Sequence, residues 1–244
     1  MESLEPLDQP PNWGRDELTN FLELAQRNAY ASFVTLRAPF AKLLAIDAFY
    51  RRLIDNLNNP ESWFAALFLL RAHSCFLAAA RTALSGQLPE TYLLLRGCLE
   101  NALYGFYLAR RPELREVWLR RHDDAASMRT VKIEFQIGTI ITSVDASDAQ
   151  AARVAKELYD RTIDYGAHPN ERALTQVLGM DRGTDHVRFE VRYLTRGDEL
   201  AFGVNLKTTA QVGVCVLDLF RLVYRERFDI LGLTDQLANL KRDL

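Results

Sequence analysis

The sequence predicts a mainly all-α protein: a helical bundle with a long central antiparallel helix pair and a small β-hairpin appendage. Three observations predict this fold class. Apolar residues recur at helical spacing through most of the chain. Two consecutive stretches, residues 60–85 and 89–110, are apolar on nearly all sides, which is typical of helices at the centre of a bundle. Finally, Val187–Tyr193 alternates with a period of two, the pattern of a strand.

The domain organisation follows from length and from the distribution of proline. The chain has 244 residues and is 48% hydrophobic, which is enough for one large domain with a sizeable core. Pro6, Pro10 and Pro11 prevent regular backbone pairing, so residues 1–14 are predicted to be a poorly ordered N-terminal arm. We find no linker and no repeat of fixed period after that, and residues 15–244 are predicted to form a single helical-bundle domain.

The first half of the bundle is predicted from its helix boundaries. Helical spacing begins after the N-terminal arm and resumes beyond Pro39, which predicts two helices or one helix kinked at that proline. Asn59 and Pro60 predict the start of the next helix, as its N-cap and its first residue. Gly86 ends that helix and Pro89 opens the following one, and so short a connection makes the two helices antiparallel neighbours.

The second half is predicted to be helical except for one hairpin. A two-stranded hairpin is not independently stable, so we expect it to lie on the helices. The predicted elements are a short charged helix at 112–122, a helix at 124–144, a helix capped by 145–148 that carries Arg161, a strand near 185–195 with its partner around 175–180, a helix at 198–224 and a last helix from residue 234.

Composition excludes several classes of protein. The formal charge of −2 and the pI near 6.1 give no global basic field that would bind nucleic acid. The three cysteines are odd in number, far apart and inside apolar patterns, which indicates buried thiols in a reducing compartment and hence a cytoplasmic protein. The longest apolar run, Trp63–Leu70, is well short of the roughly 20 residues that span a bilayer, so no membrane segment is expected.

The sequence also lacks the usual motifs of metal and nucleophile chemistry. A di-iron bundle needs Glu-x-x-His pairs, and the residue three positions before each histidine is a leucine, tyrosine or glycine. There is no Gly-x-Ser-x-Gly turn and no glycine-rich phosphate loop after a strand. We therefore expect neither a metal nor a cofactor.

One cluster of residues could carry chemistry, at the end of the helix that contains Arg161. Arg161, Tyr165 and His168 are separated by four and three residues, which places them along one stripe of a continuous helix. The opposite stripe is charged, so this one should face the interior or a cleft. Asn170 follows directly. A second polar stripe is expected to face the first, formed by Arg96, Glu100 and Tyr104.

Two interpretations of this cluster remain open, beside a small-molecule or other enzymatic role. In the first, Arg96, Glu100, Tyr165 and His168 satisfy one another in an internal polar network that sets the register of the helices. The protein would then be a binding or assembly module with an unidentified protein partner or small ligand. In the second, Arg161 and His168 are catalytic.

The second interpretation comes from a family resemblance. Arg161 is followed by the polar Thr162 and, after six intervening residues, by His168, at the end of a late helix; this arrangement resembles the motif of the HEPN superfamily. The phrases at 95–100 (LRGCLE) and 165–170 (YGAHPN) look more narrowly like an uncharacterised bacterial branch of HEPN-like bundles. The resemblance covers roughly residues 40–170.

If it extends to function, the resemblance implies metal-independent cleavage of RNA, with two copies of the motif brought together in a homodimer. Arg161 would hold the scissile phosphate, and His168 would move a proton at the ribose 2′-hydroxyl or the leaving oxygen. Long amphipathic helices at both chain ends also favour a dimer. Pro169, however, disfavours helical backbone at His168 and would turn its ring off the stripe.

Overall fold

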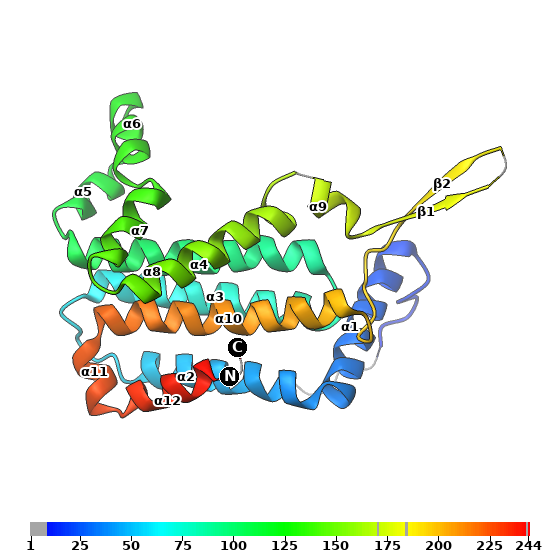
Figure 1. Ribbon diagram of the computed structural model, residues 1–244, viewed down its shortest axis with the longest axis horizontal. Helices are drawn as coiled ribbons and strands as arrows, with labels where there is room; N and C mark the ends of the chain where they lie inside the picture. Colours follow the sequence, from blue (N-terminus) through cyan, green and yellow to red (C-terminus); the bar gives the residue numbers. More distant parts are fainter. Residues whose placement is uncertain (1–8, 170, 184, 243) are drawn as a thin grey trace.

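The computed structural model describes residues 9–169, 171–183, 185–242 and 244, and it confirms the predicted helical bundle with a small hairpin (Figure 1). Residues 1–8, most of the predicted N-terminal arm, lie outside the described residues. The helices are α1 (Glu17–Thr35), α2 (Arg37–Asp55), α3 (Trp63–Ser85), α4 (Leu88–Arg110), α5 (Leu114–Leu119), α6 (Ala125–Glu134), α7 (Ile137–Asp145), α8 (Ala149–Thr162), the π-helix η1 (Ile163–Ala167), α9 (Glu171–Thr175), α10 (Leu200–Val223), α11 (Arg225–Ile230) and α12 (Leu233–Lys241). The strands are β1 (Leu178–Arg182) and β2 (Val187–Val191).

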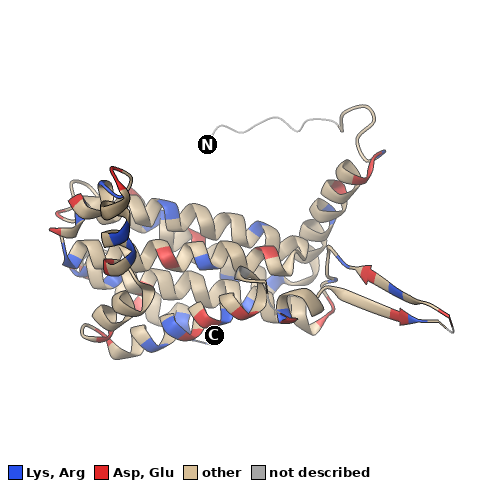
Figure 2. Cartoon of the chain, turned by 90° about the horizontal axis from the view of Figure 1, so that it is seen from above, with Lys and Arg blue, Asp and Glu red and all other residues tan. Residues whose placement is uncertain are grey.

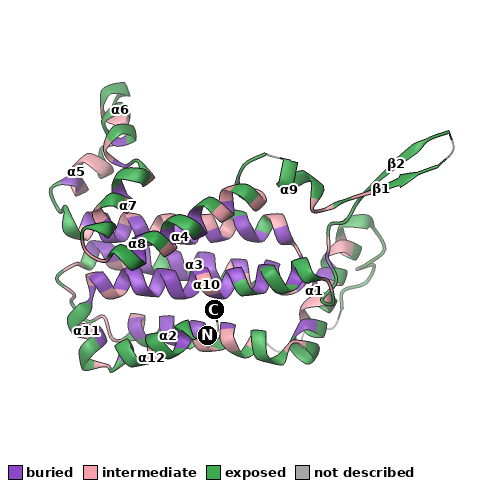
Figure 3. Cartoon of the chain, in the orientation of Figure 1, coloured by how far each residue is buried: buried purple, intermediate pink, exposed green. Residues whose placement is uncertain are grey.

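The centre of the bundle is the predicted antiparallel pair, α3 and α4, with α10 packed along both. Gly86 ends α3 in the left-handed conformation, with φ +86°, and its N–H donates to carbonyls of the last turn. Gly105 lets α4 approach both neighbours, because a Cβ there would lie 3.0 Å from Phe68 Cβ and 3.1 Å from Phe220 Cε1. These three helices hold most of the buried residues, as Figure 3 shows.

Two of the central helices are apolar enough to raise the question of a membrane. By length and composition alone α3 and α10 could each cross a bilayer, and the bent pair of α1 and α2 adds a third candidate. A helix that is apolar all round is either a membrane span or the core of a bundle. Half of the most apolar window of α3 and 67% of that of α10 are buried inside this bundle. Packing between helices therefore accounts for much of their apolar character.

Two predicted helix boundaries were wrong. The bend between α1 and α2, 101°, lies at Leu36 and not at Pro39. Pro39 stands in the first turn of α2, where a missing N–H costs no helical hydrogen bond. Asn59 and Pro60 do not start α3 either; Asn59 has φ +45°, and the helix begins at Trp63 after a turn.

The predicted helix at 124–144 is two helices. Asp124 and Ser127 were both candidate caps from the sequence; Asp124 caps α6, accepting from Ser127 N at 2.7 Å, and the backbone leaves helical geometry at Phe135. Tyr104 of α4 stacks on Phe135, with ring centroids 5.5 Å apart, and its hydroxyl donates to Phe135 O at 3.1 Å. This tertiary contact accompanies the break before α7.

The hairpin exists, but it does not lie on the helices as expected. β2 corresponds to the predicted strand near 185–195 and pairs antiparallel with β1, its neighbour in sequence. The hairpin projects from one end of the bundle (Figure 1), and nearly all its side chains are exposed. It is anchored at its base, where Thr195 N donates to Gly86 O at 2.9 Å. The sequence pattern identified the strands but could not show that the helices of the described chain leave them uncovered.

Candidate functional site

The polar cluster is centred on Arg96 in the middle of α4. Its Nε donates to Glu100 Oε1 at 2.8 Å, its Nη2 to Tyr159 Oη at 3.0 Å, and its Nη1 lies 2.8 Å from His168 Nε2. The Tyr159 hydroxyl in turn donates to Glu100 Oε1 at 3.1 Å. Four side chains from α4, α8 and the segment after η1 therefore satisfy one another. We call Arg96, Glu100, Tyr159 and His168 the Arg96 cluster.

The protonation states in the cluster follow from its hydrogen bonds. A guanidinium only donates, so His168 Nε2 must be the acceptor and the ring is neutral in this arrangement. Burial raises the pKa of Tyr159, and the neighbouring Glu100 carboxylate raises it further. Burial is the largest single influence on Arg96 and would lower its pKa, but the hydrogen bond and the charge of Glu100, together with Tyr159, outweigh burial and raise that pKa. A neutral histidine, a neutral phenol and one ion pair are thus mutually consistent.

His168 reaches α4 because the chain leaves helical geometry just before it. Residues 163–167 form a π-helical turn that is kinked at Gly166, whose backbone is not helical, with φ 173° and ψ −26°. Gly166 touches α4 closely: a Cβ there would lie 2.4 Å from Pro89 O. His168, before Pro169, has extended backbone, φ −134° and ψ 147°. Pro169 therefore has the predicted effect: the backbone of His168 is not helical.

Arg161 does not join the Arg96 cluster. The sequence placed Arg161 and His168 on one stripe, but Arg161 contacts α10 whereas His168 contacts α4. Its Nη1 donates to Gln211 Oε1 of α10 at 2.7 Å, and its Nη2 bonds Glu157 Oε1 at 2.9 Å. Arg161 follows Tyr159 by two positions, and two positions differ by about 200° around an α-helix. Since α8 packs against both α4 and α10, Tyr159 faces α4 while Arg161 faces α10.

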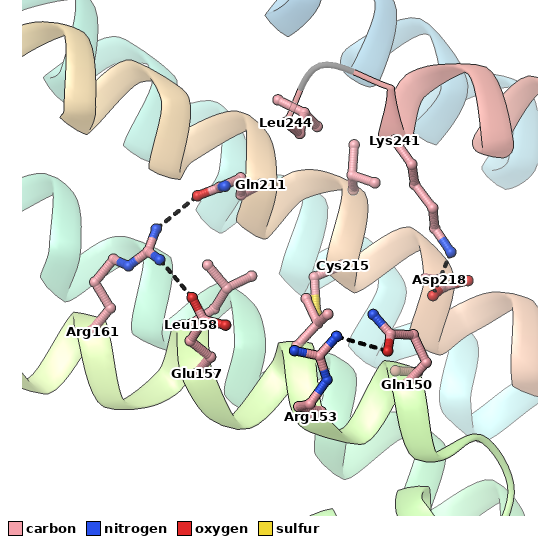
Figure 4. Close-up of a pocket in the computed structure, with 13 residues that line it drawn as sticks. Gln150, Arg153, Glu157, Leu158, Arg161, Gln211, Cys215, Asp218, Lys241 and Leu244 are labelled. Carbon is pink, nitrogen blue, oxygen red and sulfur yellow. Dashed lines mark hydrogen bonds and ion pairs between the residues drawn. The ribbon is translucent and has the colours of Figure 1, made fainter.

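Arg161 lines a groove between α8 and α10 with a volume of about 430 Å³ (Figure 4). Its floor is apolar and includes Leu158, Val214 and Cys215. Burial raises the pKa of the Cys215 thiol to about 12, which keeps it protonated and unreactive. The three cations on the rim have partners among the described residues: Arg161 as above, Arg153 on Gln150 and Lys241 on Asp218.

Two other predicted site residues, Tyr104 and Tyr165, do not join the Arg96 cluster. Tyr104 was expected to face His168 but contacts Phe135, as described above, because it is one turn too far along α4. Tyr165 is next to the cluster but contributes packing: its ring stacks on Tyr92 at 5.5 Å, and Arg172 lies 5.8 Å from its centroid. Asn170 lies outside the described residues.

Two partners were missed from the sequence, Tyr159 and Gln211. The signal for Tyr159 was available: Ala152, Ala155, Tyr159 and Thr162 share one helical stripe, and all four are buried. Small residues early in that stripe allow close approach of α8, and Tyr159 is then aimed at α4. Gln211 carried no local signal, because it becomes a partner of Arg161 only when α10 packs beside α8.

The described residues contain no group of three or more His, Cys, Asp or Glu side chains that could hold a metal ion. Comparison of the chain with protein-family models, with curated proteins and with solved structures finds no match. The resemblance to HEPN bundles therefore stays a prediction.

Proposed function

We propose that this protein is a cytoplasmic assembly module that binds a protein partner through the end of the bundle formed by α1 and the hairpin. The observation that carries the proposal is a large apolar surface left exposed at this end. Opposite residues in an antiparallel pair share a face, so Leu178 and Val191, and likewise Met180 and Phe189, lie on one side of the hairpin. All four side chains are exposed.

The exposed surface continues from the hairpin onto α1. Tyr193 extends the alternation of β2, is 70% exposed and makes an edge contact with Phe21 of α1, with ring centroids 6.3 Å apart. A groove of about 510 Å³ lies beside these two rings. We call this region the end surface; its exposed apolar residues are Leu178, Met180, Val187, Phe189, Val191, Tyr193, Leu18, Leu22 and Leu24. Contiguous apolar patches of this size on soluble proteins are typical of interaction sites.

The Arg96 cluster has a structural role under this proposal. It ties the segment after η1 to α4 and so fixes how the chain leaves the bundle towards α9 and β1. Each of the three guanidinium nitrogens of Arg96 already donates a hydrogen bond within the protein. Three of the five N–H donors of this guanidinium are therefore used inside the protein, and only two remain for a substrate phosphate, which favours a clasp over a substrate site.

The second candidate function is a metal-independent endoribonuclease that uses Arg161 and His168. In its favour, His168 is exposed and lies beside a guanidinium, and Arg161 lines an open groove. Against it, that guanidinium belongs to Arg96, while Arg161 is bonded to α10. RNA is a partner only under this candidate, and the net charge of −2 gives little attraction for it.

One experiment separates the two candidates. Wild type, Arg161→Ala, His168→Ala and Arg96→Ala are compared for cleavage of mixed RNA in the presence of a chelator and for thermal stability. The assembly proposal expects no cleavage by any form, and a loss of about 1 kcal/mol in Arg96→Ala, because Glu100 loses its cation in a site that is only partly exposed. Cleavage by wild type that disappears in Arg161→Ala and His168→Ala at unchanged stability would overturn it.

A further inference from the structure

Among the described residues, the hairpin contacts the rest of the chain at its base, and its exposure needs a physical explanation. Its apolar face is covered by no other part of the described chain, and Phe189 at its centre is 62% exposed. An isolated two-stranded hairpin is marginal in water. Both strands are also edge strands, whose free backbone groups invite pairing. A covering partner would supply the missing apolar contacts.

From this we infer that the end surface binds a second copy of this chain, with the apolar faces of two hairpins packed against each other across a twofold axis. The inference rests on the proposed function, since it names the partner of the same surface. It concerns residues 178–193 and the adjoining face of α1. Two stacked sheets pack about 10 Å apart, which leaves room for Met180 and Phe189 of each copy to interdigitate.

The charge of the hairpin favours a copy of itself over a strongly charged partner. Acidic and basic side chains are equal in number along 178–192 and are interspersed (Figure 2). They are Asp181, Asp185 and Glu190 on one hand, and Arg182, Arg188 and Arg192 on the other. Asp181 lies directly opposite Arg188 on the polar face. A balanced pattern of this kind gives no attraction to nucleic acid or to an anionic surface, and it is compatible with its own twofold copy.

The apolar area is also of the size that a dimer needs. The nine side chains of the end surface are on average about half exposed. With about 150–200 Å² for a fully exposed large side chain, they present roughly 700–900 Å². A standard protein–protein interface takes about 800 Å² from each partner. The apolar area of the end surface is therefore comparable with one side of a standard interface.

The mass of the full chain in solution tests this inference. Light scattering across a concentration series is expected to approach twice the chain mass of 27.9 kDa. Phe189→Arg, which puts a charge in the centre of the interface, is expected to weaken dimerisation by about 30-fold or more. Arg188→Ala, on the polar face of the same strand, is the matched control and should dimerise as wild type does. A circular dichroism melt verifies that each variant keeps the folded bundle.

A cross-linking pair locates the interface independently. Phe189→Cys is expected to be joined into a dimer by a short bismaleimide cross-linker, whose spacer spans the roughly 10 Å between two stacked sheets, whereas Arg188→Cys on the opposite face is not. The three native cysteines do not interfere, because they are buried and burial raises the pKa of each thiol.

The outcomes are distinguishable from those of the nuclease assay. A wild-type monomer at all concentrations, or a dimer that Phe189→Arg leaves intact, overturns the self-association inference. Neither result supports the ribonuclease candidate, because RNA cleavage is measured separately on Arg161→Ala and His168→Ala. Cleavage that depends on those two residues would overturn the assembly proposal, whatever the mass in solution.

Discussion

Phe106 on α4 and Phe189 on β2 are the same side chain in opposite surroundings. Phe106 is fully buried in the core of the bundle, whereas Phe189 projects from a hairpin that no described segment covers. The difference is one of packing partners and not of local sequence, since both residues stand in patterns with clear apolar periodicity. A periodic apolar face predicts that something will cover it; it does not say whether the cover is the same chain or another.

The largest expected effect comes from the same truncation made in the two regions. Phe106→Ala should lower the free energy of unfolding by about 3–5 kcal/mol, because it removes a buried ring and leaves a cavity. Phe189→Ala should change the stability of the monomer by less than about 0.5 kcal/mol, because its ring is mostly in water. Denaturant unfolding at low protein concentration measures both. Equal losses in the two variants would mean that the hairpin is packed on its own bundle.

An intermediate effect is expected where the two regions join. Gly86 has φ +86°, and a Cβ on it would lie 2.3 Å from Thr195 O, a backbone atom at the base of the hairpin. Gly86→Ala should cost about 1–2 kcal/mol for the left-handed backbone and a further loss from the displaced Thr195. Hydrogen exchange should show faster exchange of the Thr195 amide, which now donates to Gly86 O.

The matched control for that variant is Gly232→Ala. Gly232 also has positive φ, +62°, but a Cβ there meets nothing within 4 Å. The difference between the two variants therefore isolates the close approach of Gly86 and Thr195. If both variants lose the same stability, the contact between bundle and hairpin contributes nothing measurable.

The smallest expected effect is a pH dependence confined to the bundle. Asp148 caps α8, accepting from Ala151 N at 3.0 Å, and pairs with Arg221 of α10 at 2.9 Å. The Ala151 backbone hydrogen bond and the Arg221 cation outweigh burial and lower the pKa of Asp148. A carboxyl with a lowered folded pKa stabilises the fold above its unfolded value, near 3.9, and loses that contribution as pH falls towards the folded value.

Asp148→Asn keeps a capping side chain but removes the charge. It should therefore lower stability by about 0.5–1 kcal/mol at pH 7, and the difference from wild type should shrink below pH ~4. Thermal melts from pH 7 down to pH ~3 measure this. If the stability difference between Asp148→Asn and wild type stays constant over that pH range, the charge of the Asp148 carboxylate does not contribute to stability. The dimer is expected to be unaffected, because Asp148 lies away from the end surface.

The sequence by itself determined the helical bundle, its central antiparallel pair and the strand pattern of β2. These features depend on local periodicity, on Gly86 as a helix terminator and on Asp124 and Asp148 as helix caps, all of which act within a few residues. It also brought Arg96, Glu100 and His168 together as candidates for one network. Polar side chains on an otherwise apolar helix must form hydrogen bonds when they are buried, and the sequence offers few polar side chains that could face them.

Only the tertiary structure decided which partners meet. A π-helical turn and the close contact of Gly166 with Pro89 bring His168 to Arg96, while the packing of α10 beside α8 draws Arg161 to Gln211. The hairpin likewise owes its exposure to the path of the chain between η1 and Thr195, and no local pattern encodes that path. Contacts between residues far apart in sequence depend on how whole helices pack, so a side chain's periodicity predicts the direction it faces but not what it will face.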